Sequence, residues 1–414
     1  MKSVLAMVLA GGKGERLLPL TQDRAKAAVP FGGVCRVIDF TLSNCINSNV
    51  RKVLVLTQYK SLSLDRHLRE GWSLLSRWLN EYIDQLPPQQ RLGEDQWYQG
   101  TADAILQNIH SIEQDSADYV LILAGDHIYK MNYSYMVNFH RRKRADLTIS
   151  AVPVGKGEAQ NFGIMAVDTD NRVIGFQEKP VHPETIPGDP AHALASMGIY
   201  VFSTDVLLEQ LYLDAEDPSS THDFGHDLIP KLIHDHRVYA YHFVDENKKE
   251  ALYWRDVGTL DAYWRANMDL VAVDPLFNLY DDKWPIRTFQ PQYPPAKFVF
   301  ADEGRGARRG EAHDSVVSQG CIISGGRVLR CVLAPGVFIH SYAHVEDSVL
   351  FEGVDIGRYC RIRRAIIDED VHIPPNTVIG YDLDQDRERF HVTENGVVVI
   401  SKRAVVPQVA ELVY

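Results

Sequence analysis

The sequence predicts an α/β domain with a largely parallel sheet, followed by a triangular β-solenoid. Up to about residue 270, short apolar runs typical of buried strands alternate with helix-like segments. From residue 314 onward a four-residue motif recurs at intervals of 16 and 17 residues, which is typical of a stacked repeat. At 414 residues the chain also exceeds what one hydrophobic core usually supports, so two domains are expected.

The first expected strand, residues 4–8, runs directly into a glycine-rich turn. Gly11, Gly12 and Gly14 let the backbone turn sharply and expose consecutive N–H groups to an anion. Their spacing matches neither the G-x-G-x-x-G fingerprint of dinucleotide sites nor a P-loop. On this pattern alone, a phosphate cradle of another kind and a plain turn both remain open.

Charge and cysteine content narrow the class of protein. A formal charge of −12 and a pI near 5.7 argue against general nucleic-acid binding, so an anionic substrate would need locally concentrated cations. The first seventy residues supply them, including Arg16 and Lys26 beside the glycine turn. Five cysteines without C-x-x-C spacing indicate neither a disulfide framework nor a zinc site. No signal peptide and no run of membrane-spanning length are expected, which leaves the cytoplasm as the predicted location.

The next expected elements position an aspartate at the end of a strand, where a metal ligand is expected. A buried strand at 52–57 precedes a helical stretch that reaches Trp72, and an amphipathic segment at 102–115 precedes a second apolar strand at 119–124. That strand ends in Gly-Asp-His, and ligands of such sheets bind at the carboxyl ends of strands, which makes Asp126 a candidate metal ligand. Further expected elements are strands at 147–154, 163–167, 173–178 and 197–202 and a helix at 259–271.

A linker and a repeat follow. Prolines and aromatic residues cluster without periodicity over 274–295, and the segment 304–310 is rich in arginine and glycine. The repeated motifs begin at Asp314, Arg330, Asp347 and Arg364, each followed at nearly the same offset by Gly320, Gly336, Gly353 or Asp370. Apolar positions recur every five or six residues between them, and three such steps make one coil of a triangular solenoid. A short irregular sandwich is the alternative, and we expect the segment to serve assembly or regulation.

Several motifs together resemble the bacterial ADP-glucose pyrophosphorylases (glucose-1-phosphate adenylyltransferases), a branch of the sugar nucleotidyltransferases. The resemblance covers essentially the whole chain. Its motifs are GGKGERL at 11–17, RAKAAVP at 24–30, YQGTADA at 98–104, AGDHIYK at 124–130, EKP at 178–180, ASMGIY at 195–200 and YWRDVGT at 253–259. The resemblance implies a Rossmann-like nucleotidyltransferase domain at 1–272, a linker at 273–312 and a left-handed parallel β-helix of hexapeptide type at 313–414.

The same resemblance implies an activity and a metal site. Family members transfer the adenylyl group of ATP to glucose 1-phosphate, which gives ADP-glucose and pyrophosphate for glycogen synthesis. Such a transfer needs alignment and charge neutralisation more than covalent chemistry. The family assigns Mg²⁺ binding to the aspartates that match Asp126 and Asp256. It assigns contact with the triphosphate to the arginine and the lysine that match Arg16 and Lys26. Taken one by one, the aspartates also fit helix N-caps and the cations fit solvated surface positions.

Substrate contacts are also carried over from the resemblance. The glycine turn and the loop before the helix at 102–115 would contact the nucleotide, through Gly11, Gly12, Gly14, Gln99, Gly100 and Thr101. The residues expected to contact glucose 1-phosphate are Tyr98, Gly163, Glu178, Lys179 and Ser196. Adjacent residues of a strand face opposite ways, so a twist or bulge near the EKP motif is needed for both Glu178 and Lys179 to reach the sugar. A glycine in the base-contacting loop would permit close approach of an adenine ring.

Regulation and the rival functions remain open at this point. The family implies an allosteric homotetramer, and Arg24, Arg358 and Arg361 are candidate contacts for anionic effectors, although the arginines of the solenoid also fit a solvated face. Asp23 stands where the fructose-bisphosphate-activated type has a lysine, which puts that response in doubt. The alternatives are a nucleotidyltransferase that uses UTP, dTTP or GTP, and a non-catalytic scaffold of the same fold. For His127 and the HDFGHD run at 222–227 a structural role is favoured over metal binding, since Mg²⁺ prefers oxygen.

Overall fold

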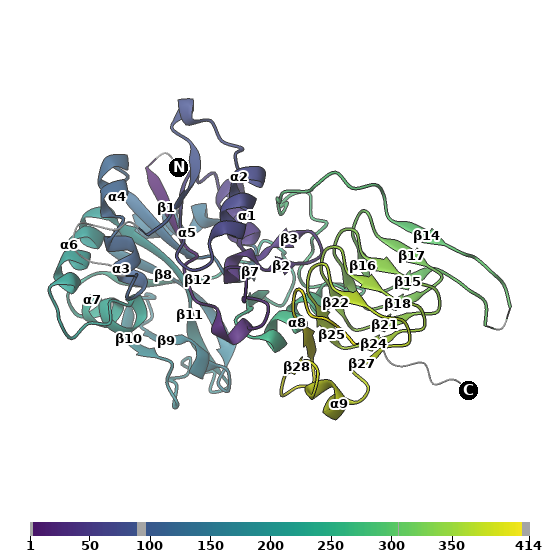
Figure 1. Cartoon of the computed structure of the whole chain (residues 1–414). Coiled ribbons are helices and arrows are strands. Elements are labelled where there is room, and N and C mark those ends of the chain that lie inside the picture. The colour runs from purple at the N-terminus through teal and green to yellow at the C-terminus, as the bar shows by residue number, and fades with distance from the viewer. Residues whose placement is uncertain (1–2, 89–96, 305, 408–414) are drawn as a thin grey trace. The chain divides into compact units, whose positions relative to one another are not determined.

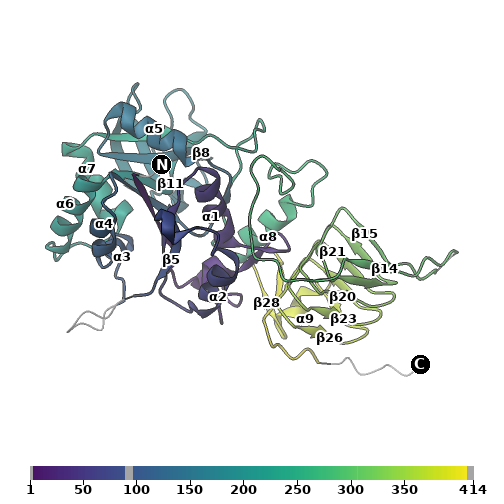
Figure 2. The same cartoon turned by 90° about the horizontal axis from the view of Figure 1, so that it is seen from above.

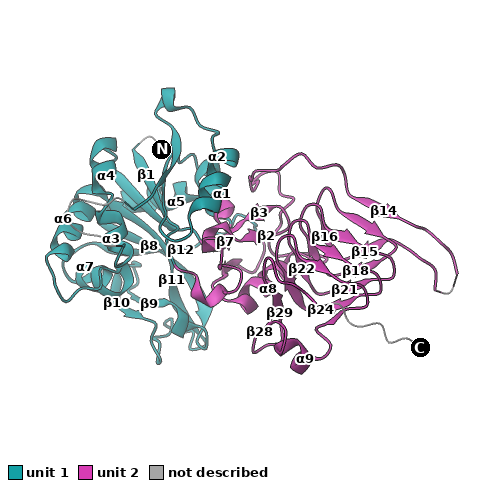
Figure 3. Cartoon of the chain, viewed as in Figure 1, with its two compact units in different colours: residues 1–12, 41–125, 130–248 teal, residues 13–40, 126–129, 249–414 magenta. Residues whose placement is uncertain are grey.

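The computed structural model describes residues 3–88, 97–304 and 306–407, which form two compact units (Figures 1 and 3). Unit 1 comprises residues 1–12, 41–125 and 130–248, and unit 2 comprises residues 13–40, 126–129 and 249–414. These units do not follow chain order, because the segments 13–40 and 249–272 pack with the C-terminal repeat region. The domain limits 1–272, 273–312 and 313–414 stay a prediction. In the described part of the chain, no helix is long and apolar enough to cross a membrane.

Unit 1 is built on a nine-stranded sheet with the order β10-β9-β11-β6-β1-β4-β5, in which β8 also pairs with β11, and β12 pairs with β8. The strands β6, β1, β4 and β5 run parallel, as predicted. The strands are β1 (Val4–Leu9), β4 (Lys52–Leu56), β5 (Tyr82–Leu86), β6 (Tyr119–Ala124), β8 (Leu147–Gly155), β9 (Gly163–Val167), β10 (Val173–Glu178), β11 (His192–Ser203) and β12 (Val238–His242). The helices are α1 (Val37–Asn47), which begins in unit 2, α2 (Leu62–Gly71), α3 (Thr101–Leu106), α4 (Ile109–Asp115), α5 (Tyr133–Lys143), α6 (Thr204–Ala215) and α7 (Ile229–Asp235).

Strand alternation explains how this sheet is covered on both faces. Side chains of a strand alternate between the two faces, and Leu5, Met7, Val120 and Ile122 share one apolar core with residues of α3, α4, α6 and α7. Those four helices lie on one side of the sheet in both views, while α1, α2 and α5 cover the other (Figures 1 and 2). Because both faces are buried, these strands read as continuous apolar runs in the sequence.

Two features of unit 1 differ from the expected elements. The segment 102–115 forms two helices, α3 and α4, interrupted at Asn108, whose side chain donates a hydrogen bond to the Ala104 carbonyl at 2.8 Å. Strand β11 is twelve residues long and pairs antiparallel with β6, β8 and β9. Alternation of strands and helices predicts parallel neighbours, so this antiparallel half of the sheet could not be expected from the pattern.

The repeat region of unit 2 is a parallel β-helix with three sheets. Strands of successive coils pair in parallel, and from β15 to β27 the paired residues are 16 or 17 positions apart, for example Ile322 with Phe338 and Phe338 with Asp355. Its strands are β14 (Lys297–Val299), β15 (Glu311–His313), β16 (Val316–Val317), β17 (Ile322–Ser324), β18 (Arg327–Leu329), β19 (Val332–Leu333), β20 (Phe338–Ile339), β21 (His344–Glu346), β22 (Val349–Leu350), β23 (Asp355–Ile356), β24 (Arg361–Arg363), β25 (Ala365–Ile367), β26 (His372–Ile373), β27 (Val378–Ile379) and β29 (Val398–Ile400). The helix α9 (Leu383–Arg387) and the strand β28 (His391–Val392) lie between β27 and β29, and β28 pairs antiparallel with β29.

The predicted repeat marks the corners of this β-helix. The four residues that open the motifs have φ between 45° and 50°: Asp314, Arg330, Asp347 and Arg364. The residues at the following offset have φ between 59° and 76°: Gly320, Gly336, Gly353 and Asp370. A left-handed backbone conformation turns the chain from one sheet to the next, so the motif recurs wherever a corner recurs. The prediction of a triangular solenoid is therefore confirmed.

A second apolar core of unit 2 anchors the N-terminal segment on one outer face of the β-helix. The short strands β2 (Pro30–Phe31) and β3 (Cys35–Arg36) pair with each other, and α8 (Leu260–Asp269) lies nearby in the same core. Phe31 and Tyr263 pack there with outward-facing residues such as Val349 and Ile366. The segment that carries Arg16 and Lys26 is thereby attached to a rigid repeat.

Candidate active site

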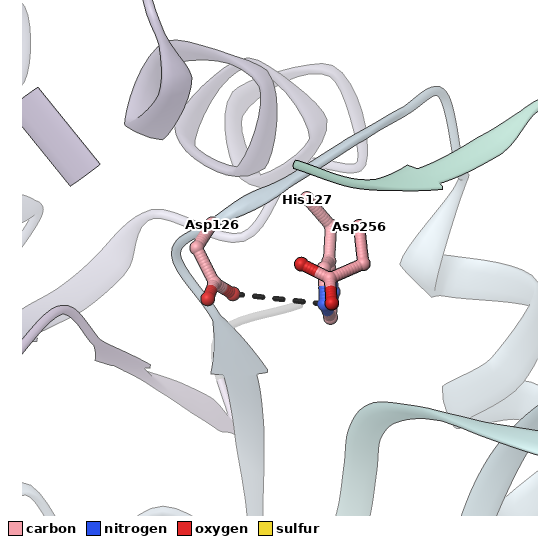
Figure 4. Close-up of side chains that lie close together, drawn as sticks. All are labelled: Asp126, His127 and Asp256. Carbon is pink, nitrogen blue, oxygen red and sulfur yellow. Dashed lines mark ion pairs between the residues drawn. The ribbon is translucent and has the colours of Figure 1, made fainter. Parts of the chain in front are cut away.

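Two short strands of unit 2 position the acidic residues. Asp126 follows β6 and directly precedes β7 (His127–Tyr129), which pairs antiparallel with β13 (Trp254–Asp256). In this register Asp256 lies opposite His127. The possible ligand atoms of Asp126, His127 and Asp256 all lie within 4.8 Å of one another (Figure 4). Two carboxylates from different parts of the chain therefore converge, as expected for a metal site of hard oxygen ligands.

Lys26 lies between the two carboxylates. Its Nζ is 2.6 Å from Oδ2 of Asp126 and 3.3 Å from Oδ1 of Asp256, and only 12% of its side chain is exposed. Burial alone would lower the pKa of Lys26, but the two carboxylates outweigh burial and raise this pKa above its ordinary value. Burial likewise opposes ionisation of Asp126, yet the charge of Lys26 holds the pKa of this carboxyl below its usual range. Lys26 and Asp126 are therefore both charged at neutral pH.

Arg16 reaches the same place through a close approach that only glycine permits. A Cβ atom on Gly258 would lie 2.9 Å from Oδ1 of Asp256 and 3.0 Å from Nη2 of Arg16. Both groups thus lie against the bare backbone of Gly258. The structure brings together four of the predicted residues, Arg16, Lys26, Asp126 and Asp256, and it adds Gly258.

The glycine turn has three different backbone environments. Gly14 has φ of 67°, which favours glycine, and its carbonyl accepts hydrogen bonds from the Leu17 amide and the Thr21 hydroxyl. In unit 1, a Cβ on Gly11 would lie 3.0 Å from Cβ of Gln58, whereas Gly12 has nothing within 4 Å of that position. Gly12 therefore offers open space beside the backbone, which is what a bound phosphate group needs.

The residues expected to contact the sugar phosphate gather in unit 1. Gly163 pairs with Glu178 across β9 and β10, and a Cβ on Gly163 would lie 3.0 Å from Oε2 of Glu178. Lys179 has φ of 46°, which breaks the strand alternation and lets its Nζ lie 2.8 Å from Oε1 of Glu178. Ser196 lies on β11 next to the pairing of Ala195 with Ile164. The predicted twist at the EKP motif is present, and Lys179 is 63% exposed.

The loop that is expected to contact the base is held by contacts with another segment of the same chain. A Cβ on Gly100 would lie 2.1 Å from the carbonyl oxygen of His222, so the close approach that this glycine permits is to the protein backbone. The Thr101 hydroxyl donates to Oδ2 of Asp223 and accepts from the Phe224 amide, both at 3.0 Å. This contact with the backbone already requires glycine at position 100, and close approach of an adenine ring stays a prediction. Base contact by Gln99, Gly100 and Thr101 stays a prediction, as does sugar contact by Tyr98, whose hydroxyl accepts from Asn108 Nδ2 at 3.0 Å.

The HDFGHD run has a structural role, as predicted. The Asp223 carboxylate accepts from the amides of Gly225 and His226 and so caps a π-helical turn at Phe224–Leu228. His222 Nδ1 lies 2.7 Å from Oδ2 of Asp214. Among the described residues, the only cluster of three or more His, Cys, Asp or Glu side chains that could hold an ion is Asp126, His127 and Asp256, and it lies outside this run.

The candidate effector residues lie in different environments. Arg24 is buried, with Nη1 2.9 Å from Oδ1 of Asp368 and Nη2 3.1 Å from Oε2 of Glu369. Its charge is therefore neutralised within the chain. Arg361 on β24 is exposed and lies over the ring of Tyr381 at 4.5 Å, and Arg358 is exposed at a corner of the β-helix. An effector role for any of the three is untested.

Comparison with known proteins agrees with the fold. Residues 5–272 match the model of the nucleotidyl transferase family, and residues 294–400 match that of the GlmU-like C-terminal hexapeptide, which accords with a left-handed β-helix. Proteins named glucose-1-phosphate adenylyltransferase are similar along nearly the whole chain. The one from Rhodopirellula baltica is 60% identical over 97% of this chain and 90% of its own length. Those from Koribacter versatilis and an Anaeromyxobacter strain are 58% and 53% identical, each over 97% of this chain and over 96% and 98% of their own lengths.

Proposed function

Since the chain belongs to the glucose-1-phosphate adenylyltransferases of the nucleotidyl transferase family, we propose that it transfers the adenylyl group of ATP to α-D-glucose 1-phosphate. The products are ADP-glucose, for glycogen synthesis, and pyrophosphate. The observation that carries this proposal is the convergence of Arg16, Lys26, Asp126 and Asp256 in unit 2. Proteins of this plan that act only as scaffolds would not need such a set of charges.

The reaction is an in-line displacement. An oxygen of the sugar phosphate forms a bond to the α-phosphorus of ATP while the bond from that phosphorus to the β-phosphate oxygen breaks. Asp126 and Asp256 fit Mg²⁺ by their donor chemistry, and the ion, when bound, would neutralise charge on the phosphate oxygens. Lys26 keeps Asp126 ionised and holds the two carboxylates close together, and Arg16 provides a second cation for the leaving pyrophosphate.

We assign binding of the substrates to the remaining residues of the predicted set. Lys179 would hold the phosphate of glucose 1-phosphate and Glu178 the sugar hydroxyls, because the left-handed backbone of Lys179 lets both side chains lie together. The other expected sugar contacts are Tyr98, Gly163 and Ser196, and the nucleotide contacts are Gly11, Gly12, Gly14, Gln99, Gly100 and Thr101.

A panel of nucleoside triphosphates tests the proposal. Purified protein is incubated with glucose 1-phosphate, Mg²⁺ and ATP, UTP, dTTP or GTP in turn, and pyrophosphate release is measured. The expected result is fastest release with ATP, together with formation of ADP-glucose. Preference for another base would overturn the adenylyl assignment, and no release with any of the four would indicate the non-catalytic scaffold.

Assembly and regulation extend the proposal. We expect a cytoplasmic homotetramer that responds to small anionic effectors, with Arg358 and Arg361 as contacts because they are exposed on the β-helix. Arg24 is a weaker candidate, since two carboxylates already neutralise its charge. Sedimentation gives the oligomeric state, and a screen of phosphorylated sugars, pyruvate and adenine nucleotides for rate changes identifies the effectors.

A further inference from the structure

We propose that His127 is a third ligand of the metal ion at Asp126 and Asp256, so that the site offers two carboxylate oxygens and one imidazole nitrogen. The inference rests on the proposed function, because it takes the two aspartates as the metal site. The preference of Mg²⁺ for oxygen ligands argues against this role for His127. The inference follows from the position of the imidazole ring in the fold.

The backbone places His127 beside both aspartates. It directly follows Asp126 in the chain, and it lies opposite Asp256 in the antiparallel pair of β7 and β13. Residues opposite one another in such a pair have Cβ atoms about 5 Å apart on the same face. The ring is held edge-on against the Trp254 ring, with centroids 5.0 Å apart at 66°, and 12% of the side chain is exposed. Packing therefore fixes the direction in which the imidazole points.

The distances suit ligands of one ion. Nε2 of His127 lies 3.6 Å from Oδ1 of Asp126 (Figure 4). Two atoms each about 2.1 Å from a common ion lie about 3 Å apart when adjacent and about 4.2 Å apart when opposite, so this separation needs only a small adjustment. Lys26 contacts the other carboxylate oxygen of Asp126, Oδ2, which leaves Oδ1 facing the imidazole. The ammonium group and an ion would therefore approach different oxygens of Asp126.

The hydrogen bonding of the ring supplies an independent observation. Nδ1 of His127 is buried and has no hydrogen-bond partner within the described part of the chain, and Nε2 is too far from Asp126 for a normal hydrogen bond. Among the described residues no hydrogen bond therefore engages Nε2, the nitrogen proposed as the ligand, and Nδ1 is the ring nitrogen that would carry the proton when Nε2 binds an ion. The structural histidine His140 is the contrast, since its Nδ1 lies 2.9 Å from Thr148 Oγ1 and its Nε2 lies 3.2 Å from Ser203 Oγ.

A nitrogen ligand changes which metals the site prefers. Imidazole suits Mn²⁺ less than it suits Co²⁺ and later metals, but it binds all of them more readily than it binds Mg²⁺. We therefore expect the site to accept Mn²⁺ and Co²⁺, and we expect replacement of His127 to weaken Mn²⁺ binding while Mg²⁺ binding changes less. A ring that serves only to pack against Trp254 would show neither effect.

The experiment uses the full chain and Mn²⁺ alone. Bound Mn²⁺ is quantified from the electron paramagnetic resonance signal of the free ion, and its spin echo is examined for modulation by a directly coordinated ¹⁴N nucleus. The expected result is ¹⁴N modulation in the unaltered protein that changes to the ¹⁵N pattern after growth on ¹⁵N-histidine. This comparison needs no substitution, so it does not depend on whether a variant folds.

Variants separate the ligand assignment from the proposed function. His127→Gln should bind Mn²⁺ about tenfold more weakly and lose the modulation, while His110→Gln, which alters an exposed histidine 3.1 Å from Glu113, should do neither. Mn²⁺ binding that Asp126→Asn abolishes, but without ¹⁴N modulation and with no change in His127→Gln, overturns the role of His127 and leaves the metal site intact. An absence of Mn²⁺ binding in the unaltered protein, or binding that Asp126→Asn does not weaken, overturns both.

Discussion

The Nζ atom of Lys26 lies 2.6 Å from Oδ2 of Asp126, and the same ammonium group reaches Asp256 at 3.3 Å. Two carboxylates in a partly buried site repel each other, and a cation between them allows both to remain ionised. Lys26 belongs to the segment that packs against the β-helix, whereas the aspartates come from β13 and from the turn before β7. This lysine thus joins three distant parts of the sequence at the point where we place the reaction.

Replacement of this lysine removes the cation without adding bulk. We expect Lys26→Met to lower kcat by about 10²- to 10³-fold, a typical loss for a group that stabilises transition-state charge. The control is Lys231→Met, because Lys231 pairs with Asp217 at 2.7 Å on the surface and has no place in the site. Steady-state kinetics of ADP-glucose formation measures the effect. Equal losses in the two variants would show that Lys26 is not specially required.

Gly258 tests the close packing of Arg16 and Asp256. In Gly258→Ala the new Cβ would press on flexible side-chain ends 2.9 and 3.0 Å away, so these ends shift while the fold persists. Displacement of reacting groups by about 1 Å costs on the order of 10²-fold in rate, which is the fall in kcat that we expect. Gly157→Ala is the matched control, since nothing lies within 4 Å of its Cβ position. Unchanged kcat in Gly258→Ala would contradict the proposed arrangement.

The Arg24 ion pairs should matter for stability. Arg24 and Asp368 are 5% and 2% exposed, and loss of one partner of a buried pair leaves an uncompensated charge. We expect Arg24→Ala to lower the free energy of unfolding of the repeat-containing unit by about 3 to 5 kcal/mol, measured by denaturant titration. Arg387→Ala, which breaks an exposed pair with Asp384, should change it little. A similar small effect in both variants would count against a structural role of Arg24.

His140 makes a pH-dependent contribution to the stability of unit 1. Burial lowers the pKa of His140 to about 4 from an ordinary value of 6.5. Because the unfolded chain takes up the proton at higher pH than the folded one, stability falls as the pH drops below 6.5, and the loss is complete near pH 4. The total is about 3 kcal/mol for this shift. Unfolding by denaturant between pH 7 and pH 5 should show a flatter pH dependence in His140→Gln than in the unaltered protein, and equal slopes would refute this assignment.

The repeat and the strand at residues 119–124 could be predicted because their signals in the sequence are local. A corner with a left-handed backbone conformation recurs at Asp314, Arg330, Asp347 and Arg364, and the same four-residue motif begins at each of these corners. The strand at residues 119–124 was also expected at its observed limits, since burial on both faces makes it wholly apolar. The alternation of segments could not predict that β11 runs antiparallel, because the direction of a strand depends on which neighbours it meets in space.

The site was predictable in its residue types and not in its contacts. The sequence motifs identified Lys26 and Asp126 as candidate site residues. The position of the Lys26 ammonium group between the two carboxylates is visible only in three dimensions. The close approach of Gly100 to the carbonyl of His222 also appears only in three dimensions, and contact of this glycine with the base stays a prediction. His127 was expected to have a structural role because Mg²⁺ prefers oxygen, and its position beside both aspartates is visible only in three dimensions.

The most direct test of the central claim is the turnover of Asp126→Asn with ATP, glucose 1-phosphate and Mg²⁺. The substitution keeps the size of the side chain and removes the charge that faces Lys26 and the metal position. We expect turnover to fall by orders of magnitude while the thermal unfolding midpoint stays within a few degrees of that of the unaltered protein. Turnover near that of the unaltered protein would contradict the assignment of Asp126 to the metal and of this cluster to the reaction.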